Sequence, residues 1–494
     1  MKIFQLKLVV LCIVVLFSAA TALAGEPRQI ILTWEDDPMT TMTITWRTEH
    51  KGDSVVRFSP VEERLEQEWK QVEARTFTFD ETKAWIHTAK LTGLNPGAEY
   101  KAVVVTAGVA AEEFSFRTAP AESREVVFVA GGDSRTNREL RREINAGAAG
   151  EDPDFVMFNG DLVEGPLSEE EWDDWFDDWH DLMITEDQRR IPLLPAMGNH
   201  EVEGFFDGEK KDAPFYYHRF MLPEPEKYYA VEFGPDLVLL TLDSGHTSDI
   251  DGEQLVWLKE TLKQYEDRYL IVQYHVPAWP SGVGEFFGRL SREIRKHWVP
   301  LFEEYGVRLA IAAHEHTYKR TPPLLLHHRD EDERELIKDA VNKATRSFDR
   351  NKDYSPEANP ELQKLAAGEW EEAGYDSHFE ALQDLCLQMA LYGVQLRKFS
   401  VNDVYELVNN TALYRDYWGR ICEENGVVYM GDGGWGAPLR QEKNADAYWW
   451  LEETTSLNHY FKVILQPEEE KLEVIPVFFH GDKWEEGDAI LLSR

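Results

Sequence analysis

Five short polar motifs lie in order along the chain, and each directly follows an apolar stretch. The apolar stretches have the length and composition of β-strands, so each motif is predicted to lie at a strand end. Together the motifs supply two aspartates, an asparagine and three histidines, a ligand set for two adjacent metal ions. The chemistry that needs such a pair is hydrolysis of a phosphate ester. The motifs are Gly132-Asp133, Gly160-Asp161, Gly198-Asn199-His200-Glu201, Val272-x-x-His275 and His314-x-His316.

The hydrophobic pattern divides the chain into an all-β part and a mixed part. Residues 25–120 contain short stretches of alternating apolar and polar side chains, such as Ile30-Leu32-Trp34, which predict a β-sandwich resembling fibronectin type III. In residues 124–324 strands alternate with helices, which indicates a central sheet covered by helices. The helices are predicted over residues 139–146, 169–182 and 253–265.

Residues 325–418 interrupt the mixed part. They are polar, charged and mostly helical, and strand patterns return in residues 419–494. We therefore expect a helical insertion within an α/β catalytic domain, acting either as a lid or as an oligomer contact. The predicted fold class is α/β, with an all-β domain before it.

The predicted helix over residues 169–182 carries aromatic residues at helical spacing with acidic residues between them. This pattern is typical of a helix that buries one face and exposes the other. We expect the aromatic residues in the core and the acidic residues on a solvated face, rather than a cation site. The acidic residues are Asp173, Asp174, Asp177 and Asp178.

Residues 1–24 have the pattern of a signal peptide. Lys2 and Lys7 precede and flank a short apolar run, and Ala22-Leu23-Ala24 is a small-residue cleavage signal. We expect cleavage after Ala24, a secreted or periplasmic protein, and no membrane anchor after cleavage. The two cysteines that remain, Cys386 and Cys422, either form one disulfide or leave Cys386 as a core residue of a helix.

The chain is strongly acidic, with a formal net charge of −39 at pH 7. Such a charge argues against nucleic acid as a partner, because the phosphate backbone would be repelled. A small phosphorylated substrate would need local positive charge, which bound metal ions would supply.

Together these motifs resemble those of a known protein family. Residues 124–321 and the C-terminal strands resemble the calcineurin-like metallophosphoesterases, which implies a four-layer α/β/β/α catalytic domain. The all-β domain and the segment His314-x-His316-x-Tyr318-x-Arg320 resemble the purple acid phosphatase branch. Two N-terminal segments carry the same resemblance, Leu91-Thr92-Gly93-Leu94-Asn95-Pro96-Gly97 and Phe114-x-Phe116-Arg117-Thr118.

The resemblance also implies roles for the motif residues. Asp133, Asp161 and His316 would hold metal one, and Asp161 would bridge to metal two, held also by Asn199, His275 and His314. The oxygen and imidazole ligands favour Fe, Mn or Zn over Ca or Mg. A hydroxide shared by the two metal ions would attack phosphorus in a phosphate monoester, and His200 would protonate the leaving alcohol. A phosphodiester or nucleotide substrate is the alternative.

Two positions depart from the family pattern. The purple acid phosphatases that this chain resembles carry Gly-Asp-x-x-Tyr at the second motif, and this chain has Glu164 in place of the tyrosine. Many calcineurin-like metallophosphoesterases carry Asp-x-His at the first motif, and this chain has Arg135 in place of the histidine. A guanidinium stays protonated and cannot bind a metal ion. Arg135 is therefore expected either to bind substrate phosphate or to form a structural ion pair, and Glu164 to be a ligand, a neighbour of the ligands or an exposed residue.

Two other interpretations compete with this one. Gly132-Asp133-Ser134 resembles the nucleophile motif of some serine esterases, but neither His459 nor His480 has an aspartate three residues earlier. The chain would alternatively be an exported module that binds metal without catalysis, because its first metal site is altered.

Overall fold

The computed structural model describes most of the chain after the predicted signal peptide. The 1–24 segment and Cys422 lie outside the described residues, so cleavage and disulfide pairing stay predictions. The described residues are 25–61, 69–282, 286, 288–327, 331–355, 358–360, 363–364, 374–375, 378–397, 400–401, 404, 408, 413–414, 426–431, 433–441 and 450–493.

The N-terminal domain is a sandwich of two antiparallel sheets, because its strands bury alternate residues between the sheets. Trp34, Ile44, Trp46 and Val104 are among the buried residues. One sheet has the strand order β1 (Arg28–Thr33), β2 (Thr41–Thr48), β6 (Trp85–Thr92) and β5 (Arg75–Phe77). The other has the order β4 (Lys70–Glu73), β3 (Ser54–Pro60), β7 (Glu99–Thr106) and β8 (Val109–Ala110), with β9 (Phe114–Arg117) also paired to β7.

The catalytic domain contains two mixed seven-stranded sheets. The first has the order β12 (Leu193–Pro195), β11 (Phe155–Phe158), β10 (Val126–Gly131), β22 (Asn458–Gln466), β23 (Lys471–Phe479) and β24 (Trp484–Glu486), with β25 (Ile490–Ser493) also paired to β23. The second has the order β13 (Tyr229–Phe233), β14 (Leu237–Thr241), β15 (Tyr269–Gln273), β16 (Leu309–Ile311), β20 (Val428–Gly431), β17 (Tyr318–Arg320) and β21 (Glu453–Thr455).

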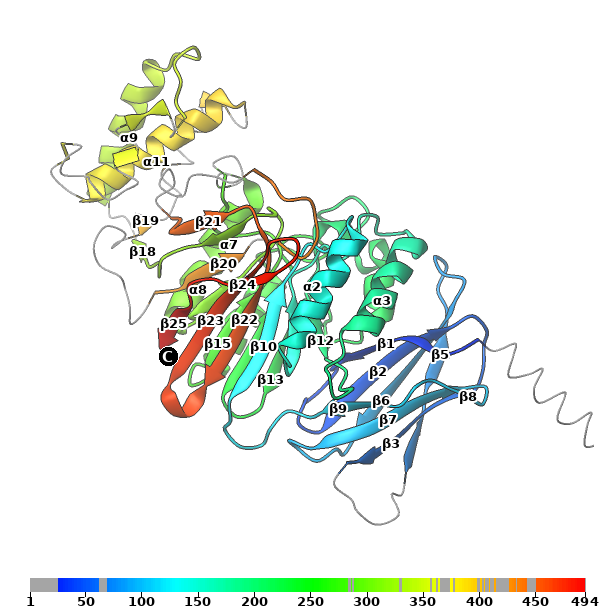
Figure 1. Ribbon diagram of the computed structural model, residues 1–494. Coiled ribbons are helices and arrows are strands. Elements are labelled where there is room, and N and C mark those ends of the chain that lie inside the picture. The colour runs from blue at the N-terminus through cyan, green and yellow to red at the C-terminus, as the bar shows by residue number, and fades with distance from the viewer. Residues whose placement is uncertain are drawn as a thin grey trace, which may run out of the picture.

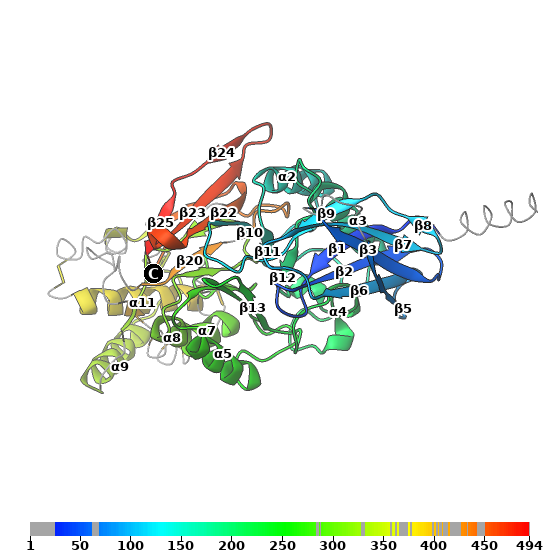
Figure 2. The same ribbon diagram turned by 90° about the horizontal axis from the view of Figure 1, so that it is seen from below.

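The two sheets pack face to face, and helices cover their outer faces (Figure 2). Alternate residues of β15 belong to different cores: Ile271 packs between the sheets, whereas Val272 packs under the helices. This confirms the predicted α/β/β/α order. The first sheet is covered by α2 (Arg138–Gly150) and α3 (Glu169–Leu182), and the second by α5 (Glu253–Gln264), α7 (Arg289–His297) and α8 (Val299–Glu304).

Helix α3 joins the two domains. Its aromatic residues Trp172, Trp175, Phe176 and Trp179 are buried, as predicted. The expected solvated acidic face is wrong, because Asp177 pairs with Arg28 and Asp173 pairs with Arg47 of the N-terminal sandwich. Figure 1 shows α3 lying beside β1. Acidic side chains on this helix therefore serve the contact between domains.

Asp178 on the same helix is completely buried and pairs with arginines of α2. Its Oδ2 lies 2.6 Å from Arg141 Nη2, and its Oδ1 lies 2.6 Å from Arg142 Nη1 and 3.0 Å from Arg138 Nη2. A buried carboxylate is stable only when it is paired. The cluster thus ties α2 to α3, and α2 begins soon after the first polar motif.

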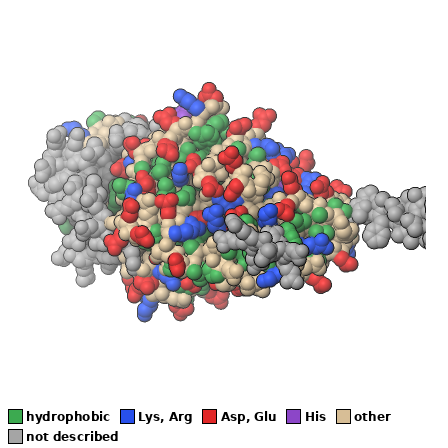
Figure 3. All heavy atoms as spheres, turned by 60° about the horizontal axis from the view of Figure 1, so that its bottom comes forward, with side chains coloured by type: hydrophobic (Ala, Val, Ile, Leu, Met, Phe, Trp, Pro, Cys, Tyr) green, Lys and Arg blue, Asp and Glu red, His purple; other side chains and the backbone are tan. Residues whose placement is uncertain are grey.

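Two helices of the insertion, α9 (Glu331–Arg346) and α11 (His378–Gln395), lie at one end of the molecule (Figure 1), and their buried residues belong to the same hydrophobic core as Val272 of β15. Two short strands, β18 (Leu326–His327) and β19 (Leu413–Tyr414), pair antiparallel where the insertion leaves and returns. Cys386 is buried within α11. Among the described helices, none combines the length and the apolar character required to cross a membrane. Acidic side chains are spread over the face shown in Figure 3, with lysine and arginine side chains among them.

Candidate metal centre

The predicted polar motifs all follow the carboxyl ends of parallel strands. Strands β10, β11 and β12 run parallel in the first sheet, and β15 and β16 run parallel in the second. Because the carboxyl ends of parallel strands meet at one edge, the two sheets present their motifs to a common site. Asp133 follows β10, Asp161 follows β11, Asn199 follows β12, His275 follows β15, and His314 and His316 follow β16.

Four of these residues have an unusual backbone conformation. Asp133, Asp161, His314 and His316 have φ values of +59°, +56°, +84° and +55°. Non-glycine residues rarely adopt positive φ, and such conformations are maintained mainly at functional sites. The chain therefore turns sharply at each strand end and directs these side chains inward.

Glycines make room for this convergence. A Cβ on Gly433, which has φ +80°, would lie 1.8 Å from Asp133 Oδ2. A Cβ on Gly160, which has φ +89°, would lie 2.6 Å from the backbone nitrogen of Gly198. Only glycine fits at these two positions, so the loops can approach the acidic side chains closely.

One group of side chains surrounds Asp161. His275 Nε2 lies 3.3 Å from Asp161 Oδ1 and 3.0 Å from Asn199 Oδ1. His314 Nδ1 lies 2.9 Å from the same Asn199 oxygen and 3.2 Å from His275 Nε2. Oxygen and nitrogen atoms of four predicted ligands of metal two thus face one another.

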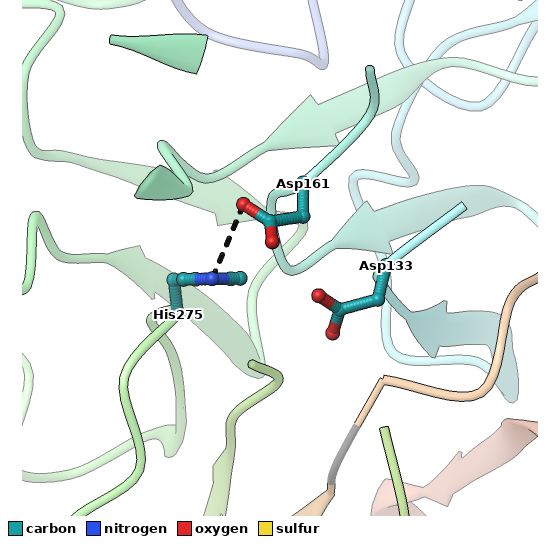
Figure 4. A group of neighbouring side chains, drawn as sticks. All are labelled: Asp133, Asp161 and His275. Carbon is teal, nitrogen blue, oxygen red and sulfur yellow. Dashed lines mark ion pairs between the residues drawn. The ribbon is translucent and has the colours of Figure 1, made fainter. Parts of the chain in front are cut away.

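A second group surrounds Asp133. His316 Nε2 lies 3.3 Å from Asp133 Oδ1. This oxygen is buried, and none of the described residues donates a hydrogen bond of normal geometry to it. Ligand atoms of Asp133, Asp161 and His275 all lie within 4.8 Å of one another. Figure 4 shows these three side chains turned toward a shared space, with the ion pair between Asp161 and His275 marked.

Hydrogen bonds on the outer side of two imidazoles fix which nitrogen faces the site. His275 donates from Nδ1 to the Asn159 carbonyl at 2.8 Å, and His316 donates from Nδ1 to the Pro438 carbonyl at 2.9 Å. A histidine that binds a metal ion is usually held in this way, with its other nitrogen free. The donor set, its burial and the Asp133 oxygen that accepts no hydrogen bond from the described residues fit bound metal ions.

The pKa values of three side chains show that the site stabilises a positive charge beside Asp161. Burial alone would lower the pKa of His275, but the Asp161 carboxylate raises it to about 10. Burial would raise the pKa of Asp161, yet His275 holds it well below its usual range. Burial, and then the neighbouring His275, lower the pKa of His314 to about 3. The His314 imidazole is thus neutral, and the nearby Asp161 carboxylate attracts a cation.

The guanidinium of Arg135 lies inside the predicted first metal site. It forms an ion pair with Glu164, its Nε lies 3.4 Å from Asp161 Oδ2, and its Nη2 lies 3.4 Å from His316 Nε2. Burial would lower the pKa of Arg135, but the Asp161 carboxylate raises it. A permanent cation therefore contacts two predicted ligands of metal one, and Glu164 pairs with that cation.

His200 lies beside Asp161 at the edge of the site. Its Nδ1 donates to the Glu164 carbonyl at 2.8 Å, and its Nε2 lies 4.0 Å from Asp161 Oδ2. Its backbone N–H donates to Asp161 Oδ1 at 3.0 Å. The imidazole is thus oriented with Nε2 toward the site, where it can transfer a proton.

Glu201 holds two loops of the site together, although no role was predicted for it from the sequence. Its Oε2 accepts hydrogen bonds from the backbone N–H groups of Gly198 and Asp161, both at 2.8 Å, and its Oε1 accepts from Leu162 at 2.8 Å. Burial, and then the Asp161 charge, raise the pKa of Glu201. Glu201 thus connects the second motif to the third. The only feature of the sequence that pointed to this role was its place at the end of the Gly198–Glu201 motif.

Ser134 cannot be the nucleophile of a serine esterase in this arrangement. It is completely buried, donates to the Leu162 carbonyl at 3.2 Å and accepts from Trp175 Nε1 at 2.9 Å. Its hydroxyl therefore packs behind the site, and its hydrogen-bond partners in the described part of the chain are a carbonyl and an indole, neither of which is a base.

Two family models match the chain. The model described as Purple acid Phosphatase, N-terminal domain, matches residues 27–118, and the model described as Calcineurin-like phosphoesterase matches residues 130–318. The second match contains all six predicted ligands. The two matches correspond to the N-terminal sandwich and to the part of the catalytic domain that carries the motifs.

Curated relatives cover part of the chain. An uncharacterized protein of Mycobacterium tuberculosis is 29% identical over 287 residues, which are 49% of this chain and 52% of the relative. Purple acid phosphatase 21 of Arabidopsis thaliana is 27% identical over 251 residues, 48% of this chain and 54% of the relative. The chain thus spans about half the length of these relatives.

Solved structures share the fold. The purple acid phosphatase from yellow lupin (Lupinus luteus) seeds aligns with a TM-score of 0.64 at 16% identity, covering 95% of this chain and 75% of that one. The structure of PhoD aligns with a TM-score of 0.60 at 8% identity, covering 95% and 91%. Motifs, fold and family matches agree: the chain carries a calcineurin-like phosphoesterase domain, preceded by the N-terminal domain of the purple acid phosphatases.

Proposed function

We propose that this protein is an exported, metal-dependent phosphatase that hydrolyses phosphate monoesters at a site for two metal ions. The observation that carries the proposal is the meeting of six ligand side chains from both sheets, with His200 beside them. Their oxygen and imidazole nitrogen atoms suit Fe, Mn or Zn. The family matches support the same chemistry.

Asp133, Asp161 and His316 would hold one metal ion, and Asp161, Asn199, His275 and His314 the other. When bound, the two ions would supply a water of lowered pKa and positive charge for the phosphate oxygens. Asp161 lies between the two groups of ligands, 3.3 Å from His275 and 3.4 Å from Arg135. It is therefore the side chain best placed to serve both ions.

His200 would protonate the leaving oxygen of the substrate. Because Nδ1 donates to the Glu164 carbonyl, the proton for the leaving group would come from Nε2, which faces Asp161. Arg135 would donate hydrogen bonds to the phosphate oxygens, since its guanidinium lies between the ligands and Glu164.

The first experiment compares a monoester with a diester. Purified protein loaded with Fe, Mn or Zn is expected to hydrolyse p-nitrophenyl phosphate faster than bis(p-nitrophenyl) phosphate. A chelator and the Asp161→Ala substitution are expected to abolish the activity, whereas Asp174→Asn, a surface acid of α3, keeps it. A faster diester reaction would establish the phosphodiesterase alternative. Metal binding without hydrolysis of either ester would establish a non-catalytic module.

The export part of the proposal rests on the 1–24 pattern alone. Expression of the full chain in a bacterial host is expected to yield a mature protein that begins at Gly25 and collects outside the cytoplasm. Mass spectrometry of the purified protein measures its N-terminus. A cytoplasmic protein that retains residues 1–24 would contradict this part and leave the proposed chemistry unaffected.

A further inference from the structure

A cavity of about 380 Å³ opens directly beside the candidate metal centre. Asn199, His200 and His314 line it on the side of the site, and Phe205, Val276 and Leu290 line it with apolar surface. A group bonded to a phosphate held by the predicted ligands would extend into this space. The cavity is thus continuous with the reactive centre and differs from it in chemistry.

Phe205 is the most unusual residue of the cavity. It has a φ of +71°, which is rare for a bulky side chain, and 47% of it is exposed. Its ring contacts the His200 ring edge to face, with centroids 5.4 Å apart. An exposed aromatic ring on a strained backbone beside the predicted proton donor indicates a binding role rather than a packing role.

The loop that carries Phe205 is firmly anchored. The Phe205 carbonyl accepts a hydrogen bond from His246 Nδ1 at 3.1 Å, and the Gly208 N–H donates to the His246 carbonyl at 2.7 Å. The neighbouring Phe206 ring stacks on the His246 ring, with centroids 5.2 Å apart. Because this loop is held on both sides of Phe205, the ring is positioned before a substrate arrives.

The opposite wall is also apolar. Leu290 packs against Gly245, where a Cβ would lie 2.7 Å from Leu290 Cδ2. Arg289 stands at the rim and pairs with Asp207, its Nη2 lying 3.0 and 3.1 Å from the two carboxylate oxygens. The charge of Arg289 is therefore already balanced, so the cavity does not favour a second phosphate group.

We propose that this cavity binds the leaving group of the substrate and selects apolar, aromatic alcohols, with Phe205 as the specificity-determining residue. The inference rests on the proposed function, because it assumes that phosphate occupies the metal centre. The substrate class is then a phosphate monoester of an alcohol with an aromatic ring, which stacks on Phe205 and displaces water from Val276 and Leu290.

The test uses two esters with leaving groups of similar acidity, so that their intrinsic reactivities are alike. Metal-loaded wild-type protein is expected to hydrolyse 2-phenylethyl phosphate with a kcat/KM on the order of 10- to 100-fold above that of ethyl phosphate. Phe205→Ala is expected to reduce this ratio to a few-fold, because the loss of kcat/KM is larger for the phenylethyl ester than for the ethyl ester. Phe205→Leu, which keeps apolar surface but has no ring for stacking, is expected to keep only part of the ratio, and Val256→Ala, an exposed apolar residue of α5, leaves it unchanged.

Binding of two non-hydrolysable phosphonates separates the inference from the proposed function. Calorimetry is expected to show that 2-phenylethylphosphonate binds more tightly than ethylphosphonate, and that Phe205→Ala removes the difference. Equal binding and equal kcat/KM values for the two pairs would overturn the inference. Preferential binding of the phenylethyl compound without hydrolysis of either ester would overturn the proposed function and support the cavity's role.

Discussion

The Arg135 guanidinium pairs with the Glu164 carboxylate at the edge of the metal centre. The two residues stand at the two positions where the sequence departs from the family pattern. Glu164 therefore balances a cation that the altered first motif introduces, and the two departures form one structural unit. This relationship gives the proposed first metal site a permanently charged neighbour.

Replacing Arg135 by histidine should restore a ligand to the first site. After dialysis we expect wild-type protein to retain about one metal ion, because its first site binds the second ion weakly, and Arg135→His to retain about two, because imidazole binds metal and guanidinium does not. Metal analysis after dialysis measures the stoichiometry directly. Arg135→Gln is the matched control, since it removes the charge without adding an imidazole. Two tightly bound ions in wild-type protein would refute this prediction.

Removing the His200 imidazole should affect poor leaving groups most. His200→Ala is expected to lower kcat for ethyl phosphate by roughly 10²- to 10⁴-fold, the usual contribution of a general acid. The loss should be much smaller for p-nitrophenyl phosphate, whose leaving group departs without a proton. Steady-state kinetics on the two esters measures the difference, and metal content should stay unchanged. An equal loss on both esters would argue against proton donation by His200.

Breaking the buried cluster on α3 should destabilise the protein. Asp178→Asn leaves the buried guanidinium of Arg141 without its carboxylate, so we expect the free energy of unfolding to fall by roughly 3 kcal/mol. Asp174→Asn removes a partly exposed pair with Arg138 and should cost under about 1 kcal/mol. Urea unfolding of the two variants makes the comparison. Similar losses in both would show that burial of the pair is unimportant.

The N-terminal sandwich should lose stability in acid through His87. This ring is completely buried, contacts the hydroxyls of Thr48 and Ser54, and has its pKa lowered by burial to about 4. An unfolded histidine has a pKa of about 6.5. Between these values the unfolded chain binds more protons, so stability falls as the pH falls from about 6.5 to about 4.

His87→Gln should therefore flatten this pH dependence. Between pH 7 and pH 4.5 we expect wild-type protein to lose about 2–3 kcal/mol more than the variant. His87 lies in β6, which pairs with β2, so amide hydrogen exchange in these two strands as a function of pH measures the stability of this domain. Parallel stability curves for the two proteins would show that His87 does not control the acid sensitivity.

The strand ends and the positions of the predicted ligands could be predicted because they depend on local sequence. An apolar run followed by a glycine and an acid indicates a strand that ends in a tight turn, and both Asp133 and Asp161 lie there. The helix over residues 169–182 was predictable from the spacing of its tryptophans. In both cases the residues that matter are neighbours along the chain.

Contacts between distant segments could not be predicted in this way. The acids of α3 looked like a solvated face, because the arginines that pair with Asp173 and Asp177 belong to another domain. Glu201 was visible only as part of a motif, since its role depends on N–H groups of a different loop. The exposure of the Phe205 ring could not be predicted from the sequence, because the positive φ of this residue depends on the packing around it.

The insertion leaves and returns through a short antiparallel ribbon, in which Leu326 pairs with Tyr414 and Leu324 bridges Val427. Its two ends are therefore neighbours in space. The ribbon holds the two ends of the insertion together between His316 and Gly433 in sequence, whatever the length of the chain that joins them. A second protein domain with its own termini close together, such as a fluorescent protein, could consequently be joined to the chain at these paired ends.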